Sequence, residues 1–385
     1  MVKISKRGSM DSFIVMDTLA KANEMERNGE TVYRFEAGQP AFKAPQKVRD
    51  AGIDAINNTN VGYTSPIGLP ELRNEIANHY KDHYGADVNP NAIFITPGSS
   101  GAFSLTFLAC FEAGDRVAMA MPCYPSYKRI LESFGVEIVA LMSTKDDKYQ
   151  PTVALLEEAK KGGKIDGLIV ASPNNPTGTL LNNEELTTLL NYCENEKIRV
   201  VSDELYHGVE FSESKPLSAL QINNDSIIIN SFSKFFCMTG WRLGWVIVPD
   251  SMIKTFNNLQ SNLFISAPTT SQYAAVKAFE CKDELSQNIK RYENNRDLFV
   301  KELTDMGITE FSYPEGGFYL YADISHLTND SVAWANELLE KAKVSVSAGV
   351  DFDPYRGNTT IRFSYVCDYE HSKAGLAKLK EFINS

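Results

Sequence analysis

The middle of the chain alternates short, continuous apolar runs with longer amphipathic stretches, and this alternation limits the folds that are open to it. The apolar runs cover residues 92–96, 116–121, 167–171, 199–203 and 226–230. Continuous runs, unlike runs in which every second residue is apolar, are typical of strands buried on both faces of a parallel sheet. A helix predicted at 184–196 suits a crossover between two such strands. The sequence therefore predicts an α/β fold with a mostly parallel sheet flanked by helices.

The C-terminal part of the chain has a different rhythm. A long amphipathic stretch predicts a helix that ends at Gly307, and strands and helices alternate after it. The predicted helices cover 283–306, 331–343 and 369–383, and the predicted strands cover 318–322 and 360–365. We interpret residues 283–385 as a smaller α+β domain, and residues 46–282 as the large domain that carries the sheet.

Bulk properties exclude several classes of protein. A chain of 385 residues, of which 43% are hydrophobic, can build a large core. The net charge of -11 argues against a nucleic-acid partner, and no apolar run is long enough to cross a membrane. The six cysteines form no Cys-x-x-Cys pair, which favours free thiols in a reducing cytoplasm. His79 and His83 lie one helical turn apart without a third ligand, so we predict no metal site.

Four polar segments lie at or just after predicted strand ends, where a doubly wound sheet binds its ligand. The segments are 97–102, 172–178, 202–206 and 231–245. The first is a glycine-serine turn before a helix that we expect from about Ala102. Its backbone amides would cradle a phosphate, although a plain tight turn fits the same residues.

The other three segments carry residues suited to an aromatic aldehyde cofactor. Asn175 stands between two prolines, so its side-chain amide can donate in a fixed direction. Asp203 suits a pyridine nitrogen that has to stay protonated, and Tyr206 suits a phenolic oxygen on the same ring. Lys234 would hold the aldehyde as a Schiff base if its amine loses a proton near neutral pH. The alternative is a surface lysine in a loop.

Further residues would complete such a site. The hydroxyl groups of Ser231 and Ser233 and the guanidinium group of Arg242 suit a phosphate. Tyr124 follows another predicted strand and would stack on a flat cofactor, unless it packs in the core. Arg362 lies on an apolar strand and needs an anion, which is either a bound carboxylate or an acidic neighbour in the fold.

In this order along the chain, the segments resemble those of class I/II aminotransferases, which are pyridoxal-phosphate enzymes of fold type I similar to aspartate aminotransferase. The resemblance rests on Asn-Pro-Thr-Gly at 175–178, on Tyr-x-x-x-x-Gly-x-x-x-Leu-Arg at 63–73 and on the lysine segment, and it extends from about residue 36 to 362. It implies an amino-acid aminotransferase that passes an amino group to a 2-oxo acid through pyridoxal 5′-phosphate. It also implies that residues 1–45 pack with the small domain.

The resemblance implies a role for each matching residue around the cofactor ring. Lys234 would carry the cofactor and then move a proton between the substrate Cα and the cofactor's C4′. Asp203 would pair with the pyridine nitrogen. Asn175 and Tyr206 would contact the phenolic oxygen, and Tyr124 would stack on the ring.

The resemblance also implies contacts for the phosphate and the substrate. The phosphate would lie on a group of hydroxyl and guanidinium donors, namely Ser99, Ser100, Ser231, Ser233 and Arg242. Tyr63 would reach the phosphate of the neighbouring subunit, which makes a homodimer part of the site. Arg362 would grip the substrate α-carboxylate, assisted by the backbone near Gly38 and by Asn175.

One departure from the family concerns the substrate. Some prokaryotic aspartate aminotransferases of this kind have a lysine where Ser100 stands and a hydroxyl residue near Ile14, and use them to recognise a second carboxylate. Here the lysine is absent, and Phe13 and Ile14 are apolar. We therefore expect an apolar or aromatic donor rather than aspartate, unless a cation from elsewhere in the fold replaces the lysine.

Two other functions stay open at this point. A pyridoxal-phosphate β-lyase that acts on cysteine conjugates shares the fold and the first proton loss, so the motifs do not separate it from an aminotransferase. A non-enzymatic sensor, like the aminotransferase-like domain of some transcription regulators, needs an additional DNA-binding domain. An acidic chain with so few residues before Gly38 leaves no room for one.

Overall fold

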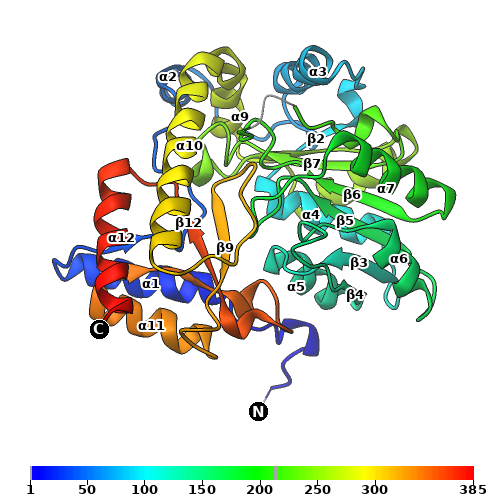
Figure 1. Ribbon diagram of the computed structural model, residues 1–385. Coiled ribbons are helices and arrows are strands. Elements are labelled where there is room, and N and C mark those ends of the chain that lie inside the picture. Colours follow the sequence, from blue (N-terminus) through cyan, green and yellow to red (C-terminus); the bar gives the residue numbers. More distant parts are fainter. Residues whose placement is uncertain (1, 212–214) are drawn as a thin grey trace.

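The computed structural model describes residues 2–211 and 215–385, and its largest element is a seven-stranded sheet (Figure 1). The strands lie in the order β2-β8-β7-β6-β5-β3-β4. Their bounds are β2 Ile93–Thr96, β3 Arg116–Ala120, β4 Glu137–Leu141, β5 Gly167–Ala171, β6 Arg199–Asp203, β7 Ile227–Ser231 and β8 Gly244–Ile247. Neighbours are parallel, except that β8 runs antiparallel to both β2 and β7. The prediction of an α/β fold with a mostly parallel sheet is confirmed.

The apolar runs form strands because both faces of this sheet are buried. Successive residues of a strand point to opposite faces. In β7, Ile227 and Ile229 pack in one hydrophobic core while Ile228 packs in a second core on the other face. The first core continues into the C-terminal part of the chain, where it includes Phe299 and Phe363.

Helices α2 to α9 pack around the sheet. Their bounds are α2 Gln46–Asn58, α3 Pro70–Tyr84, α4 Gly98–Cys110, α5 Pro125–Phe134, α6 Val153–Lys160, α7 Asn183–Asn195, α8 Ile253–Leu263 and α9 Thr269–Val276. The expected start of a helix near Ala102 is wrong, because α4 already begins at Gly98. Ser99 and Ser100 therefore belong to the first turn of a helix rather than to a turn that precedes it.

The C-terminal part contains a three-stranded antiparallel sheet with the order β11-β12-β9. A two-stranded parallel sheet, β1-β10, lies in the same part. The strands are β1 Tyr33–Arg34, β9 Tyr319–Asp323, β10 Val344–Ser345, β11 Ser347–Ala348 and β12 Thr360–Ser364. The helices are α10 Lys282–Asp305, α11 Ser331–Ala342 and α12 Tyr369–Ile383. This arrangement is the smaller α+β unit that the change of rhythm predicts.

The first helix, α1 (Ile14–Arg27), lies beside the C-terminal elements rather than beside the large sheet (Figure 1). Lys21 of α1 forms an ion pair of 2.6 Å with Glu340 of α11. Val15 packs with Tyr321 and Phe352. The domain limits at 45/46 and 282/283 stay predictions.

Within the described residues, none of the helices has the length and apolar character needed to span a membrane.

Candidate active site

Lys234 follows the carboxyl end of β7 and points toward the N-terminal segment. Its Nζ donates a hydrogen bond of 2.6 Å to the carbonyl oxygen of Gly38 and lies 5.7 Å from the centre of the Tyr206 ring. Burial, reinforced by the positive charge of Arg362, lowers the pKa of Lys234 to about 8. A lysine with this pKa offers a neutral amine at mildly alkaline pH, which an exposed lysine does not.

Asp203, the last residue of β6, is almost wholly buried and is held by two donors. The backbone N–H of Leu205 donates to Oδ1 at 3.0 Å, and the hydroxyl group of Tyr127 donates to Oδ2. Burial raises the pKa of Asp203 to about 6. Sequence reasoning missed Tyr127, because its contact joins α5 to a strand end that is far away along the chain.

Tyr206 contacts a second tyrosine that the sequence did not single out. Its hydroxyl oxygen lies 2.8 Å from that of Tyr319, which comes from β9 of the smaller unit. Burial raises the pKa of both phenols, so both are protonated at neutral pH. Each hydroxyl group can therefore donate one hydrogen bond.

Arg362, on the neighbouring strand β12, reaches into the same cluster. Its Nη1 donates to Oδ1 of Asn175 at 3.0 Å, and its Nη2 donates to the carbonyl oxygen of Glu36 and to Oγ of Ser347. Only 3% of Arg362 is exposed, yet no carboxylate within the described residues lies within ion-pair distance of it. Its Nε also lacks a hydrogen-bond partner there. A buried, uncompensated guanidinium group calls for an anionic ligand, which disfavours the structural ion pair.

The predicted phosphate donors lie around the first turn of α4. Ser99 is half-buried and Ser100 is exposed. A Cβ atom on Gly98 would stand 2.5 Å from Nη2 of Arg242, so the glycine lets the guanidinium group approach the helix N-terminus. A helix N-terminus beside a cation attracts anions.

The two predicted serines after β7 complete this region. Ser231 and Ser233 are buried, and Oγ of Ser231 donates to Oγ of Ser233 at 2.8 Å. The space in front of Arg242 is a cavity of about 640 Å³, which Gln39 and Trp241 also line.

Aromatic and apolar side chains form another wall. Tyr124 is half-buried and makes edge contacts with Tyr127 at 5.3 Å and with Phe13 at 6.1 Å between ring centres. Ile14, also half-buried, begins α1 next to Phe13. Arg129 lies 5.2 Å from the Phe13 ring, but its Nη2 pairs with Asp351 at 2.7 Å. The charge of Arg129, beside this wall, is thus compensated by Asp351.

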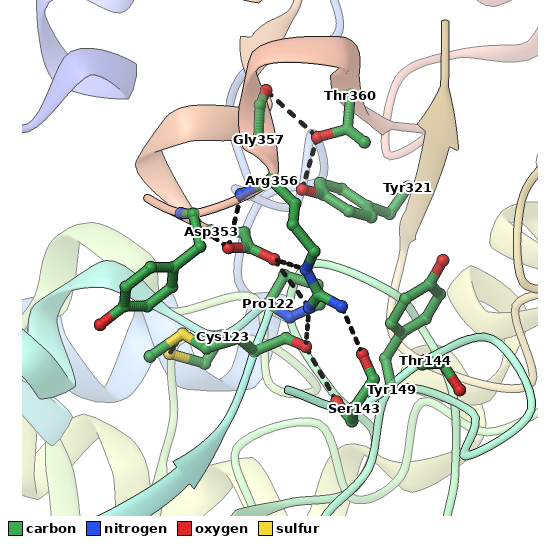
Figure 2. Close-up of polar contacts among 12 residues, drawn as sticks. Pro122, Cys123, Ser143, Thr144, Tyr149, Tyr321, Asp353, Arg356, Gly357 and Thr360 are labelled. Carbon is green, nitrogen blue, oxygen red and sulfur yellow. Dashed lines mark hydrogen bonds and ion pairs between the residues drawn. The ribbon is translucent and has the colours of Figure 1, made fainter. Parts of the chain in front are cut away.

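The segment that carries Tyr124 is anchored by Arg356, which sequence reasoning also missed. Nη2 of Arg356 donates to the carbonyl oxygen of Met121 at 2.8 Å, and Nη1 donates to that of Ser143 at 2.9 Å. Asp353 orients the guanidinium group through Nε at 2.8 Å (Figure 2). A loop of the smaller unit therefore fixes the end of β3, from which the Tyr124 segment leaves.

The structure brings together most of the predicted residues but not all of them. Five of them contact one another or pack against the same side chains: Lys234, Asp203, Tyr206, Asn175 and Arg362. Tyr63 does not join them: it lies in the loop between α2 and α3, with 83% of its surface exposed.

Comparison with known proteins gives one family. The family model "Aminotransferase class I and II" matches residues 30–379. A valine–pyruvate aminotransferase of Mycobacterium tuberculosis is 41% identical over 366 residues, which cover 94% of each chain. A (5-formylfuran-3-yl)methyl phosphate transaminase of Methanocaldococcus jannaschii is 37% identical, over 98% of each chain.

Solved structures give the same result. An aminotransferase from M. tuberculosis has a TM-score of 0.96 at 39% identity, with both chains wholly covered. Aspartate aminotransferase of Thermus thermophilus with maleate has a TM-score of 0.93 at 29% identity, covering 99% of this chain and 100% of that one. The likeness therefore extends over the whole chain.

Proposed function

The chain belongs to the class I and II aminotransferases and is an amino-acid aminotransferase, and we propose that it works with pyridoxal 5′-phosphate carried on Lys234. One observation supports this most strongly. A lysine with a lowered pKa lies in one buried cluster at the strand ends with an arginine that has no acidic partner among the described residues. Such a pair suits a substrate that brings its own carboxylate next to a reacting amine.

The residues fit this cofactor. Asp203 would face the ring nitrogen, Tyr206 and Asn175 the phenolic oxygen, and Tyr124 one face of the ring. The phosphate would lie among the donors near the start of α4, which are Ser99, Ser100, Ser231, Ser233 and Arg242. When bound, the cofactor supplies an electron sink that makes the substrate Cα–H acidic and accepts the amino group.

The chain's own residues then move the proton. Nζ of Lys234, an amine with a pKa of about 8, would take the proton from the substrate Cα and would also give a proton back in the reverse direction. Arg362 holds the α-carboxylate, and Asn175 and the backbone at Gly38 keep it in place. Asp203, buried and fixed by Tyr127, would pair with the ring nitrogen.

We propose that apolar or aromatic amino acids are better donors than aspartate. The wall formed by Phe13, Ile14 and Tyr124 carries no free charge, and Arg129 next to it is paired with Asp351. A second carboxylate there would lose its hydration without gaining a cation.

We also propose a homodimer in which Tyr63 reaches the phosphate of the partner's site. Tyr63 is exposed in the single chain, and apolar residues near it in the sequence are exposed as well: Ile53 at 58%, Ile56 at 64% and Val61 at 44%. Such a group of exposed apolar residues is typical of an interface.

The six free cysteines suit a reducing compartment such as the cytoplasm.

The test is an absorbance spectrum of the purified protein before and after addition of single amino acids. The visible band of the bound cofactor should give way to the band of its amine form, fastest with apolar or aromatic donors. Release of pyruvate from cysteine conjugates without a 2-oxo acid, and without the amine form, would instead indicate a β-lyase.

A further inference from the structure

Tyr319 contacts three parts of the site, although no sequence motif marks it. Its side chain is 1% exposed, and its hydroxyl oxygen lies 2.8 Å from that of Tyr206. The guanidinium carbon of Arg362 lies 4.4 Å from the centre of its ring. A Cβ atom on Gly38 would stand 1.8 Å from its hydroxyl oxygen, so Tyr319 occupies the space that a side chain at position 38 would need.

Packing alone does not account for the hydroxyl group. A phenylalanine would fill nearly the same volume and would keep the ring beside Arg362. The hydroxyl group is buried, and Tyr206 is its only hydrogen-bond partner within the described residues. Burying a hydroxyl group is favourable only when its hydrogen bond is made, so this bond is the feature that distinguishes tyrosine from phenylalanine here.

The direction of the bond follows from the number of protons. Each phenol has one proton to donate. In the proposed function the hydroxyl group of Tyr206 donates a hydrogen bond to the phenolic oxygen of the cofactor, so its one proton is used there. The proton between the two tyrosines then comes from Tyr319, and the two hydroxyl groups form a chain that ends on the cofactor. A hydroxyl group that accepts a hydrogen bond becomes a stronger donor itself.

We propose that Tyr319 is a positioning residue of the reaction: its hydroxyl group donates to Tyr206 and thereby holds and strengthens the Tyr206 bond to the cofactor's phenolic oxygen. The inference rests on the proposed function and assigns a residue of the smaller unit to it. Tyr206 and the proton on the lysine–cofactor nitrogen compete for the same phenolic oxygen. A stronger Tyr206 bond therefore favours loss of that proton.

The experiment is a pH titration of the visible absorbance band of the cofactor-loaded protein. In Tyr319→Phe the midpoint should move to higher pH, by a few tenths to about one pH unit, which corresponds to part or all of one hydrogen bond. The other charged groups that act on Lys234 are Arg362, Asp203 and Arg242, and none of them is substituted in this variant.

Tyr321→Phe is the matched control. Tyr321 lies two residues further along β9, is also buried, and bonds through its hydroxyl group to Oγ1 of Thr360 at 2.6 Å, outside the cluster (Figure 2). Its removal should leave the midpoint at the wild-type value. A shift of equal size in both variants would mean that β9 acts only as a scaffold and would overturn the proposal.

A double-mutant cycle keeps the test decisive if Tyr319→Phe also disturbs the fold. Because Tyr319 acts through Tyr206, its substitution should shift the midpoint in the wild-type background and not in a Tyr206→Phe background. Equal shifts in both backgrounds, or an unchanged midpoint in Tyr319→Phe alone, would refute the role of Tyr319. A wild-type protein without any visible band would refute the proposed cofactor instead.

Discussion

Burial acts on Lys234 and Asp203 in opposite senses, because it disfavours the charged form of any side chain. It lowers the pKa of the lysine to about 8 and raises that of the aspartate to about 6. The first shift makes the amine available as a nucleophile and base. The second shift means that the anionic form of Asp203 is unfavourable until a cationic partner, such as a protonated ring nitrogen, faces it.

Because the buried anion is unfavourable, Asp203→Asn should stabilise the cofactor-free protein, and the gain in stability should depend on pH. The pKa of Asp203 rises from 3.8 to about 6 on folding, so the folded state is favoured below pH 4 and loses that advantage as the pH rises through 6. Well above pH 6 the free energy of unfolding of the asparagine variant should be about 3 kcal/mol higher than that of the wild type. Tyr127 can rotate its hydroxyl group to accept from the new amide.

Urea unfolding of both cofactor-free proteins between pH 4 and pH 8 measures this difference. The two curves should converge near pH 4. Asp54→Asn, at an exposed position of α2, is the control and should match the wild type throughout. A gain that is the same at every pH would show that the charge of Asp203 is not its cause.

Arg362→Ala should raise the KM for amino and 2-oxo acids by about 10- to 100-fold, since hydrogen bonds to a charged group contribute about 1.5–3 kcal/mol. Steady-state kinetics with the best donor and acceptor measure the change. Arg27→Ala, at the exposed end of α1, removes an arginine elsewhere and should leave KM unaltered. An unaltered KM in Arg362→Ala would place the carboxylate site elsewhere.

At the scale of elements, the N-terminus of α4 depends on two close approaches. Gly98 adopts a φ of +71°, and a Cβ atom there would also meet Arg242. A Cβ atom on Gly244 of β8 would lie 2.9 Å from the backbone nitrogen of Ser99. The glycines thus allow helix, strand and guanidinium group to converge on one point.

Gly98→Ala should therefore weaken cofactor binding by about tenfold or more, because a displaced Arg242 loses a charged hydrogen bond to the phosphate. Titration of the cofactor-free protein with pyridoxal phosphate, followed by absorbance, gives the dissociation constant. Gly8→Ala serves as the control, since no atom lies within 4 Å of a Cβ atom there. Wild-type affinity in Gly98→Ala would mean that the phosphate lies away from α4.

Elements with a strong local pattern were predictable, and those without one were not. The helix predicted at 369–383 has the bounds of α12, because an amphipathic period follows Asp368, whose side chain caps the helix. The start of α4 was misplaced, since its glycine and two serines have weak helix propensity and become helical only beside the buried end of β2. β8 was missed because it begins inside the lysine segment and runs antiparallel to its neighbours.

Site residues at strand ends were predictable for a similar reason, and their supporting residues were not. Asp203 and Lys234 follow apolar strands within short, polar segments. Tyr127, Tyr319 and Arg356 lie in segments that carry no such mark, and their contacts span long sequence separations. The packing of α5 on the large sheet brings Tyr127 to the site, and the packing of the smaller unit against the sheet brings Tyr319 and Arg356.

At the scale of the whole molecule, the proposed dimer predicts complementation between two defective chains. Lys234→Ala should be inactive, and Tyr63→Ala should bind the cofactor weakly in the partner's site. In a hybrid dimer, the Lys234 of one chain and the Tyr63 of the other form one intact site. Random mixing should restore about a quarter of the wild-type activity at limiting cofactor. Half of the dimers are then hybrids, and one of the two sites in each hybrid is intact.

The mixture is assayed after the chains have exchanged, with each variant alone as the control. Activity equal to the average of the two separate variants would contradict a site shared between subunits. Tyr63 would then act within its own chain or not at all.

The most direct test of the central claim is to trap the cofactor on its lysine. The purified protein, loaded with pyridoxal phosphate, is reduced with borohydride and digested, and the labelled peptide is identified by mass spectrometry. We predict one label, on Lys234. A label on another lysine, or no label on a protein that shows the visible band, would contradict the account of this site.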